Sequence, residues 1–441
     1  MLNKKISPSF LSILAAGVLI GGIALSAYGQ DPSGRPSSPS TKPRRKKPAK
    51  PVEVSPEEFT ITLTVLTQEA GCEVYVNGEL RGTSGSDGKF LVNKLPQGHY
   101  TVEVRKAGFV PSSQTFNAGP DTPTLVFKLT ADLSGKLNQF DSLLAGGKLV
   151  GPGSPNALEI VEELGHKFPD RPEVGRIRLA LAQKLRDEAE QPAKQVAHWR
   201  EMDRVAITTA QMYAAKSAAL NQDDKRAQAL DLFFQGVGSL RDWQMAQETA
   251  DPKPAAGAPA DPRLTEAKDK LQKAVALQDT LVAADYQLGV VCLLLNDGVA
   301  AEGAFAKAAQ LEPTLAIARI GVGDSMFAEG KRKDAVAQYK KAVDLDPNSS
   351  TAHAGLGLAQ AMNGQSKDGL KEIEKAISLD PKAALPHYDL GLALADSKKK
   401  KDREHAAEEL KKAIELNSKN LEFQNSVAQQ VLANIANDKR K

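Results

Sequence analysis

The histidines are the side chains of this sequence with the widest choice of chemistry, since imidazole can bind a metal ion or move a proton. There are six of them: His99, His166, His198, His353, His387 and His405. His353 and His387 stand 34 residues apart, and the sequence around them repeats with the same spacing. No cluster of cysteine, aspartate or glutamate at ligand spacing completes a metal site beside them. We interpret this pair as equivalent positions on neighbouring helices.

The two cysteines, Cys72 and Cys292, fall in separate predicted domains. This gives little support for a disulfide, and Cys292 is expected to be a small buried side chain. The sequence also lacks a glycine-rich phosphate loop, a nucleophile elbow and an HExxH motif. It therefore predicts a protein that is not an enzyme and that needs no cofactor and no metal ion.

The stretch from Val282 to Asn417 repeats itself every 34 residues. Each unit has an apolar-Gly pair in its first half, at Leu288-Gly289, Val322-Gly323, Leu356-Gly357 and Leu390-Gly391. The second half carries small and large apolar residues in a fixed order, as in Ala301, Phe305, Ala308, Leu311 and Pro313. Small residues let two antiparallel helices approach closely, and proline stops the second helix. The pattern resembles the tetratricopeptide repeat, which implies helix-turn-helix units stacked into a superhelix.

The ends of the repeat array depart from this pattern. In the fourth unit Ala406 arrives three residues late, and we place the insertion in a solvated loop from Ser397 to Asp402. An upstream half unit is visible, and its missing first helix is predicted at Arg226–Glu248, with the Pro/Ala-rich stretch looped out between the pair. A helix from Leu421 to Ile435 is expected to cap the last unit.

From Phe59 to Leu129 the apolar residues alternate with a period of two, and Asn77-Gly78 is a hairpin-turn signal. The order GCEVYVNGELRGTS followed by KLPQGHYTVEVRKAGFVP resembles the PEGA domain. The resemblance implies an envelope-facing β module without catalytic residues, although the segment that gives the family its name is degenerate here. Tyr75, His99 and Tyr100 could contact a sugar, or they could be cross-strand packing pairs.

The N-terminus is typical of an export signal. Lys4 and Lys5 precede an almost wholly apolar run from Phe10 to Ala27. The run is long enough that an uncleaved inner-membrane anchor is the alternative, and the basic residues that follow would then favour the inverted orientation. We expect an exported chain, periplasmic or at the cell surface. The basic cluster, with Arg44, Arg45, Lys46 and Lys47, could dock on envelope polymer or an anionic membrane surface, or it could be a solubilising spacer.

The predicted fold is mainly α: a tetratricopeptide-like α-solenoid preceded by an irregular helical region and a small antiparallel β-sandwich. The predicted boundaries are 1–29 for the signal or anchor, 30–55 for a disordered linker, 56–131 for the β domain, 132–249 for the helical region, 250–263 for the Pro/Ala-rich loop, 264–417 for the repeats and 418–441 for the cap and tail. The formal net charge of +3 argues against a dedicated nucleic-acid binder.

The resemblance to tetratricopeptide repeats implies that the first helix of each unit lines a concave groove. Counting from the unit starts gives the partner-binding candidates Tyr286, Val290, Leu293, Ile320, Asp324, Phe327, Leu358, Tyr388 and Leu392. They are mostly apolar, which suits an amphipathic helix or an extended hydrophobic peptide. The chain's own middle or C-terminal helices could instead fill the groove.

Two functions follow from these observations. The first is a non-enzymatic exported adaptor that recruits a protein or peptide through the groove, with the β domain facing the envelope. The alternative is an envelope polysaccharide- or cell-wall-binding protein that uses the β domain, with the repeats as a spacer or oligomerisation device.

Overall fold

The computed structural model describes residues 60–152, 155–195, 204–249, 260–417 and 425–438. The predicted signal or anchor, the linker with its basic cluster, and most of the Pro/Ala-rich loop lie outside these residues. The chain divides into two compact units, one ending at Lys148 and the other comprising Leu149–Pro152 and Ala157 onwards. Among the described residues, every helix is too short or too polar to cross a membrane.

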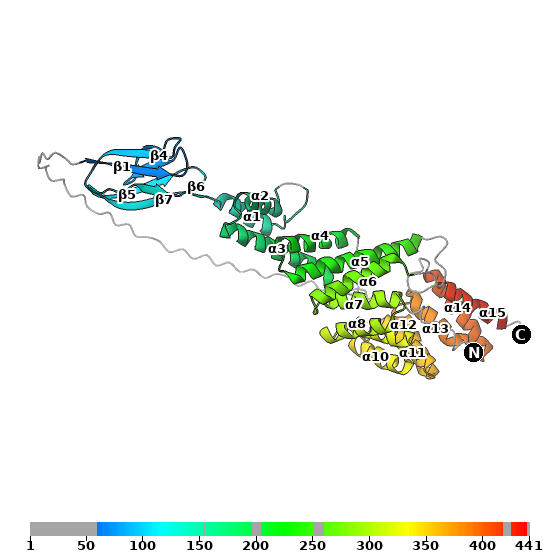
Figure 1. Ribbon diagram of the computed structural model, residues 1–441. Coiled ribbons are helices and arrows are strands. Elements are labelled where there is room, and N and C mark those ends of the chain that lie inside the picture. Colours follow the sequence, from blue (N-terminus) through cyan, green and yellow to red (C-terminus); the bar gives the residue numbers. More distant parts are fainter. Residues whose placement is uncertain (1–59, 153–154, 196–203, 250–259, 418–424, 439–441) are drawn as a thin grey trace, which may run out of the picture. The chain divides into compact units, whose positions relative to one another are not determined.

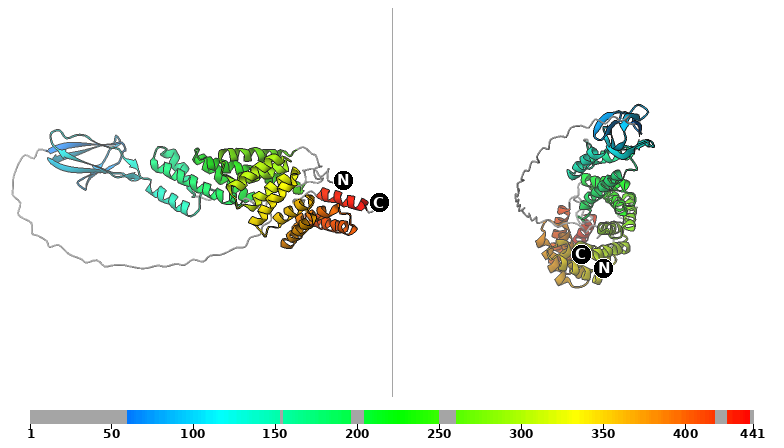
Figure 2. Two further views of the ribbon diagram at one scale, coloured as in Figure 1. Left: turned by 90° about the horizontal axis from the view of Figure 1, so that it is seen from below. Right: turned by 90° about the vertical axis from the view of Figure 1, so that its left-hand side faces the viewer.

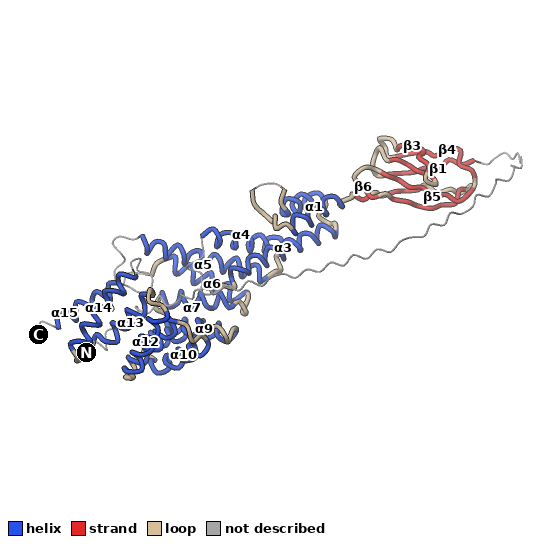
Figure 3. The backbone as a smooth tube through the Cα atoms, turned by 180° about the vertical axis from the view of Figure 1, so that it is seen from behind, coloured by secondary structure: helices blue, strands red, loops and turns tan. Residues whose placement is uncertain are grey.

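The first unit is built from short strands and one helix (Figure 1, Figure 3). The helix is α1 (Ser134–Ala145). The strands are β1 (Thr60–Thr67), β2 (Glu73–Val76), β3 (Glu79–Thr83), β4 (Lys89–Pro96), β5 (Gly98–Arg105), β6 (Phe109–Val110), β7 (Ser112–Ala118), β8 (Leu125–Phe127) and β9 (Thr130–Ala131). They form a three-stranded sheet in the order β4-β1-β8, a four-stranded sheet in the order β3-β2-β5-β7 and the pair β6-β9.

Alternating side chains of the two larger sheets bury one shared core. Leu63 and Val65 from one sheet and Val74, Val102 and Val104 from the other are wholly buried in it. The hairpin between β2 and β3 turns at Asn77 and Gly78, whose φ angles of 49° and 81° suit these residue types. The strand pairs are antiparallel as predicted, except that β8 runs parallel to β1.

The second unit is a stack of helices (Figure 2). The helices are α2 (Ala157–Lys167), α3 (Pro172–Ala193), α4 (Arg204–Leu220), α5 (Lys225–Thr249), α6 (Pro262–Leu277), α7 (Val282–Leu294), α8 (Gly298–Leu311), α9 (Ala316–Ala328), α10 (Arg332–Leu345), α11 (Ser350–Met362), α12 (Ser366–Leu379), α13 (Ala384–Ala395), α14 (Lys400–Leu416) and α15 (Asn425–Asp438). From α3 onwards each helix packs against the next, and the odd-numbered helices also pack against one another. The predicted fold class, stacked helix pairs after a small β domain, is confirmed.

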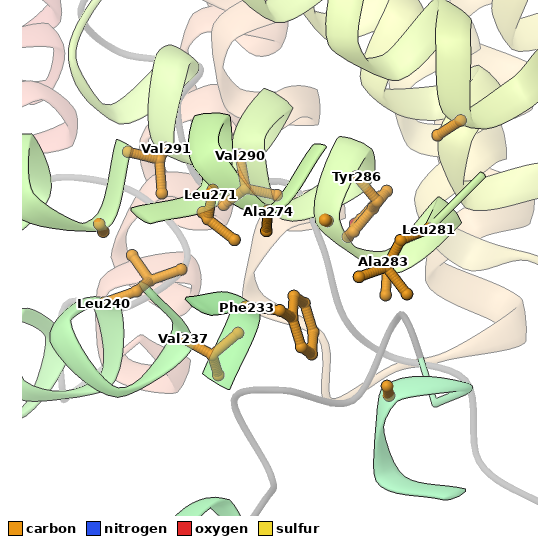
Figure 4. Close-up of a cluster of buried hydrophobic side chains, with 14 of the residues drawn as sticks. Phe233, Val237, Leu240, Leu271, Ala274, Leu281, Ala283, Tyr286, Val290 and Val291 are labelled. Atoms are coloured by element: carbon orange, nitrogen blue, oxygen red, sulfur yellow. The ribbon is translucent and has the colours of Figure 1, made fainter. Parts of the chain in front are cut away.

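The packing of the second unit continues upstream of the clear repeats. Helix α5 pairs with α6, although the residues between them include a stretch outside the described chain. One core cluster runs from α3 through α9, and Figure 4 shows its part around Phe233, Leu271 and Tyr286. Helix α6 begins at Pro262, inside the predicted loop, because proline suits the first helical position and the Asp261 side chain accepts a hydrogen bond from the Arg263 N–H.

Close approach between the helices depends on glycine. A Cβ atom added to Gly289 or Gly321 would lie 2.8 or 2.5 Å from the ring of Phe305, which therefore fits against both α7 and α9. Tyr339 lies in the same way against Gly323 and Gly355, one unit further on. The regular spacing of these glycines is therefore a packing requirement.

The three-residue insertion of the fourth unit lies partly in a helix, which corrects the predicted loop. Helix α14 begins at Lys400 and has 17 residues, whereas α8, α10 and α12 have 14 each. Asp402 favours the helical form because it stands in the first turn, where a negative charge meets the positive end of the helix dipole. The Ser397 hydroxyl also donates a hydrogen bond of 2.6 Å to Asp402 Oδ2.

Candidate functional site

The predicted groove residues lie on the first helices of the repeats, α7, α9, α11 and α13. Seven of the nine side chains are buried in the structure: Tyr286, Val290, Leu293, Ile320, Asp324, Leu358 and Tyr388. Phe327 and Leu392 are partly exposed. Buried side chains offer no contact area to a partner. The burial weighs against these seven as binding residues, and partner binding by any of the nine stays a prediction.

Seven of the nine residues belong to three different core clusters. Tyr286, Val290 and Leu293 belong to the core that runs from α3 to α9, where the ring of Tyr286 meets Phe305 edge-on with 5.4 Å between centroids. Ile320 and Phe327 belong to a second cluster around Tyr339. Tyr388 and Leu392 belong to a third, which includes α14 and α15.

Asp324 is the predicted groove residue with the most unusual environment. It is fully buried, and Tyr339 Oη donates a hydrogen bond of 2.6 Å to its Oδ1. Its Oδ2 has no hydrogen-bond partner among the described residues. Burial raises the pKa of the Asp324 carboxyl well above its usual range, although the bond from Tyr339 acts in the opposite direction. The Asp324–Tyr339 pair could have been found from the sequence, because Tyr339 occupies the repeat position at which α8 has Phe305.

Two further buried groups on α7 have perturbed acidity. Burial raises the pKa of the Asp285 carboxyl to about 6, Lys307 lowers it, and Asp279 raises it further. Burial also raises the pKa of the Cys292 thiol to about 11. Cys292 is 1% exposed, as expected for a small core side chain, and Cys72 and Cys292 are both free thiols. Neither group has the exposed, activated environment of a nucleophile.

The histidine pair lies at equivalent positions of α11 and α13, as the 34-residue spacing predicts. Each imidazole is 1% exposed and contacts a glutamate, Glu372 for His353 and Glu409 for His387. Within the described part of the chain, no group of three or more His, Cys, Asp or Glu side chains could hold a metal ion.

The aromatic side chains of the β domain are engaged with their own sheet. Arg105 lies over the ring of Tyr75, 4.4 Å from its centroid. Tyr100 stacks on Phe116 at 5.8 Å and donates a hydrogen bond to the Pro96 carbonyl oxygen. His99 is hydrogen-bonded to Asn117 on the neighbouring strand. These contacts favour the cross-strand packing interpretation over a sugar-binding surface.

Comparison with known families identifies the centre of the helical array. Residues 323–364, from α9 to the end of α11, match the family model described as TPR repeat. This stretch is a tetratricopeptide repeat. The 34-residue spacing carries the same sequence pattern beyond the matched tetratricopeptide stretch in both directions.

Parts of the chain are also similar to solved structures of other proteins. MamA 41-end from Desulfovibrio magneticus RS-1 is 27% identical over 35% of this chain and 86% of its own, with a TM-score of 0.30. YrrB, described as a TPR protein with an unusual peptide-binding site, is 22% identical over 47% of this chain and 94% of its own, with a TM-score of 0.33. A tetratricopeptide repeat protein from Parabacteroides merdae is 14% identical over 68% and 98%, with a TM-score of 0.37. No curated protein matches the chain.

Proposed function

We propose that this chain is a non-enzymatic scaffold whose repeats hold a protein or peptide partner. The observation that carries the proposal is the series of stacked helix pairs from α7 to α14, within which one stretch matches the tetratricopeptide repeat. Arrays of this kind offer an extended surface made of many helices, which suits partner binding better than chemistry.

Phe327 on α9 and Leu392 on α13 are the apolar groove candidates that remain partly exposed. We propose that they contact the partner. A well-buried apolar anchor contributes roughly 1.5–3 kcal/mol, whereas association costs about 4–15 kcal/mol. Two anchors alone are therefore too few, and the partner must also contact polar or backbone groups nearby.

We further propose that the chain is exported and that its β domain is a PEGA-like module facing the envelope. The support is sequence order: basic Lys4 and Lys5 before the apolar run Phe10–Ala27, and the PEGA-like series of turns from Gly71 to Pro111. The basic cluster that follows the run supports contact with anionic polymer or headgroups. Fractionation of cells, with N-terminal sequencing of the mature chain, tests export and distinguishes a cleaved signal from an anchor.

The partner-binding proposal is tested with peptides selected by display on the whole exported chain, followed by calorimetric titration. The double variant F327D/L392D should weaken binding by tenfold or more, because it places two charges where apolar anchors are needed. The matched control is V299D, since Val299 on α8 is 74% exposed and is not a groove candidate. Equal affinity for both variants would contradict the proposal. Retention of the chain on envelope polymer, without any peptide binding, would favour the polymer-binding alternative.

A further inference from the structure

The outer face of the sheet β4-β1-β8 carries apolar side chains that point away from the core of the β domain. In the strand register, Leu66 of β1 stands beside both Lys89 of β4 and Val126 of β8, and Thr64 stands beside Leu91. Cross-strand partners lie on the same face of a sheet, and this face alternates with the buried one. Leu91 is 44% exposed and Val126 is 56% exposed, while Leu66 is partly exposed. The three apolar side chains therefore form one exposed patch.

Three exposed lysines, Lys89, Lys94 and Lys128, lie on the strands of this sheet or directly after them. Lys128 follows β8 between two buried residues and so continues the exposed side of that strand. Within the described chain, none of the three lysines makes an ion pair. Strands β1, β4 and β8 contain no aspartate or glutamate. Asp87, in the loop before β4, accepts a hydrogen bond from the backbone N–H of Lys89.

Lys94 stands at an irregularity of β4. The register between β1 and β4 shifts between Ile61 and Leu63, so that Asn93 and Lys94 both stand opposite Thr62. A bulge of this kind changes the direction of the side chains in it. Lys94 has a φ of 58°, a left-handed conformation that is costly for residues other than glycine, asparagine and aspartate. The other two non-glycine residues with positive φ in the described chain are asparagines. A lysine is thus exposed here although the backbone favours other residue types.

The second large sheet of the domain, β3-β2-β5-β7, has a different charge arrangement. Its two arginines are paired with acids on the same strands, Arg81 with Glu79 at 3.0 Å and Arg105 with Glu103 at 2.8 Å. Charges on this sheet are therefore balanced by neighbours. The positive charges of the sheet β4-β1-β8 have no such partners among the described residues, so they are available to an anion outside the domain.

A partner for this face has to accept both the apolar patch and the positive charges. An anionic membrane surface offers negative headgroups to lysine and an apolar boundary to leucine and valine. A soluble polyanion would leave Leu91 and Val126 in water. A second copy of the same face would place lysines against lysines, which is unfavourable. The combination of charges and apolar side chains thus favours lipid.

We propose that the outer face of the sheet β4-β1-β8 docks the β domain on anionic lipid membranes. We call this surface the lysine-rimmed face, and it consists of Leu66, Lys89, Leu91, Lys94, Val126 and Lys128. Each lysine near an anionic surface should raise the affinity about fivefold, and salt should weaken binding through screening. The inference rests on the proposed envelope-facing role of the β domain for its setting in the cell.

Sedimentation of the purified chain 30–441 with vesicles tests the inference. The variant R44Q/R45Q/K46Q/K47Q serves as the parent, because it reduces the attraction of the basic linker. This parent should bind mixed phosphatidylglycerol–phosphatidylcholine vesicles and not phosphatidylcholine alone. Adding K89Q/K94N/K128Q should weaken binding by up to about a hundredfold, fivefold for each charge. Asparagine is chosen at position 94 because it tolerates positive φ.

The apolar patch is tested separately. In the same parent, L91S/V126S should weaken vesicle binding by about tenfold, because these two side chains no longer transfer apolar area out of water. The matched control is L80S, since Leu80 is 55% exposed on β3 of the other sheet. The control for net charge is K340Q/K341Q/K375Q, which removes three positive charges at exposed positions of α10 and α12. Both controls should bind like the parent.

Amide hydrogen exchange of the parent with and without mixed vesicles gives a second measurement that needs no substitution in the β domain. Protection should rise in β1, β4 and β8 and stay constant in β3 and β5. The inference is overturned if the parent does not bind mixed vesicles or if protection rises in the other sheet. It is also overturned if the lysine variant loses binding while L91S/V126S does not, since a surface for soluble polyanions behaves in that way. Vesicle binding is independent of export and of peptide capture, so its failure would leave the cell fractionation and peptide titrations to decide those proposals.

Discussion

Replacing Gly357 with alanine should separate α11 from α12. A Cβ at this position would lie 2.5 Å from the backbone oxygen of Gly369 and 2.6 Å from Ile373 Cγ1. A backbone oxygen cannot move away by changing rotamer, so the two helices must shift by several tenths of an ångström. Overpacking of this kind costs about 1–3 kcal/mol, while alanine gains about 1 kcal/mol of helix propensity over glycine. We expect a net loss of stability of up to about 2 kcal/mol, the difference between these two terms.

Gly303 on α8 is the matched control for this prediction. It is exposed, and a Cβ added to it would meet nothing within 4 Å. Gly303→Ala should therefore stabilise its helix by about 0.5–1 kcal/mol through propensity alone. Thermal melts of both variants, with amide exchange in α11–α12 and in α8 to locate the effect, provide the assay. The steric reasoning is refuted if Gly357→Ala is as stable as Gly303→Ala.

Two predictions concern the buried carboxylates. Tyr339→Phe should lower the free energy of unfolding by about 1–3 kcal/mol, because it leaves Asp324 without its hydrogen-bond donor. The double variant D324V/Y339F should recover most of this loss in urea melts, because it copies the Val290–Phe305 combination of the preceding repeat. No recovery would contradict this account. For Asp285, a folded pKa raised to about 6 means that its contribution to stability is largest in acid and is lost as the pH rises from about 4 to about 6. Asp285→Asn should remove this loss, and melts that change equally with pH in the variant and the wild type would contradict it.

The repeat architecture was predictable because the regular spacing of residues in the sequence is a direct result of how the helices pack. Glycine at fixed positions and an aromatic residue on the second helix are visible in the sequence, and the structure shows why, since Phe305 needs Gly289 and Gly321 beside it. The turn at Asn77-Gly78 was predictable for the same reason, because few other residues adopt positive φ at both positions.

The burial of the candidate groove residues was harder to predict, because helical position does not determine burial. Tyr286 has the groove position of its helix, yet it is 1% exposed and packs on Phe305. The extra turn of α14 was missed because a lysine run suits a loop and a helix start equally well. The glutamates that contact His353 and His387 could have been found from the sequence, since Glu372 and Glu409 occupy the same place in their repeats.

The position of Phe305 against Gly289 and Gly321 also determines where this protein can be cut. The aromatic ring packs against helices of two consecutive units. A boundary placed at the turn between two units therefore separates segments that share this packing contact. Ending the chain after α8 would uncover one face of this ring. Excising residues 316–349, one full period, would instead bring Gly355 to the place of Gly321. The array should therefore be shortened or lengthened by whole periods, with its terminal helices kept in place.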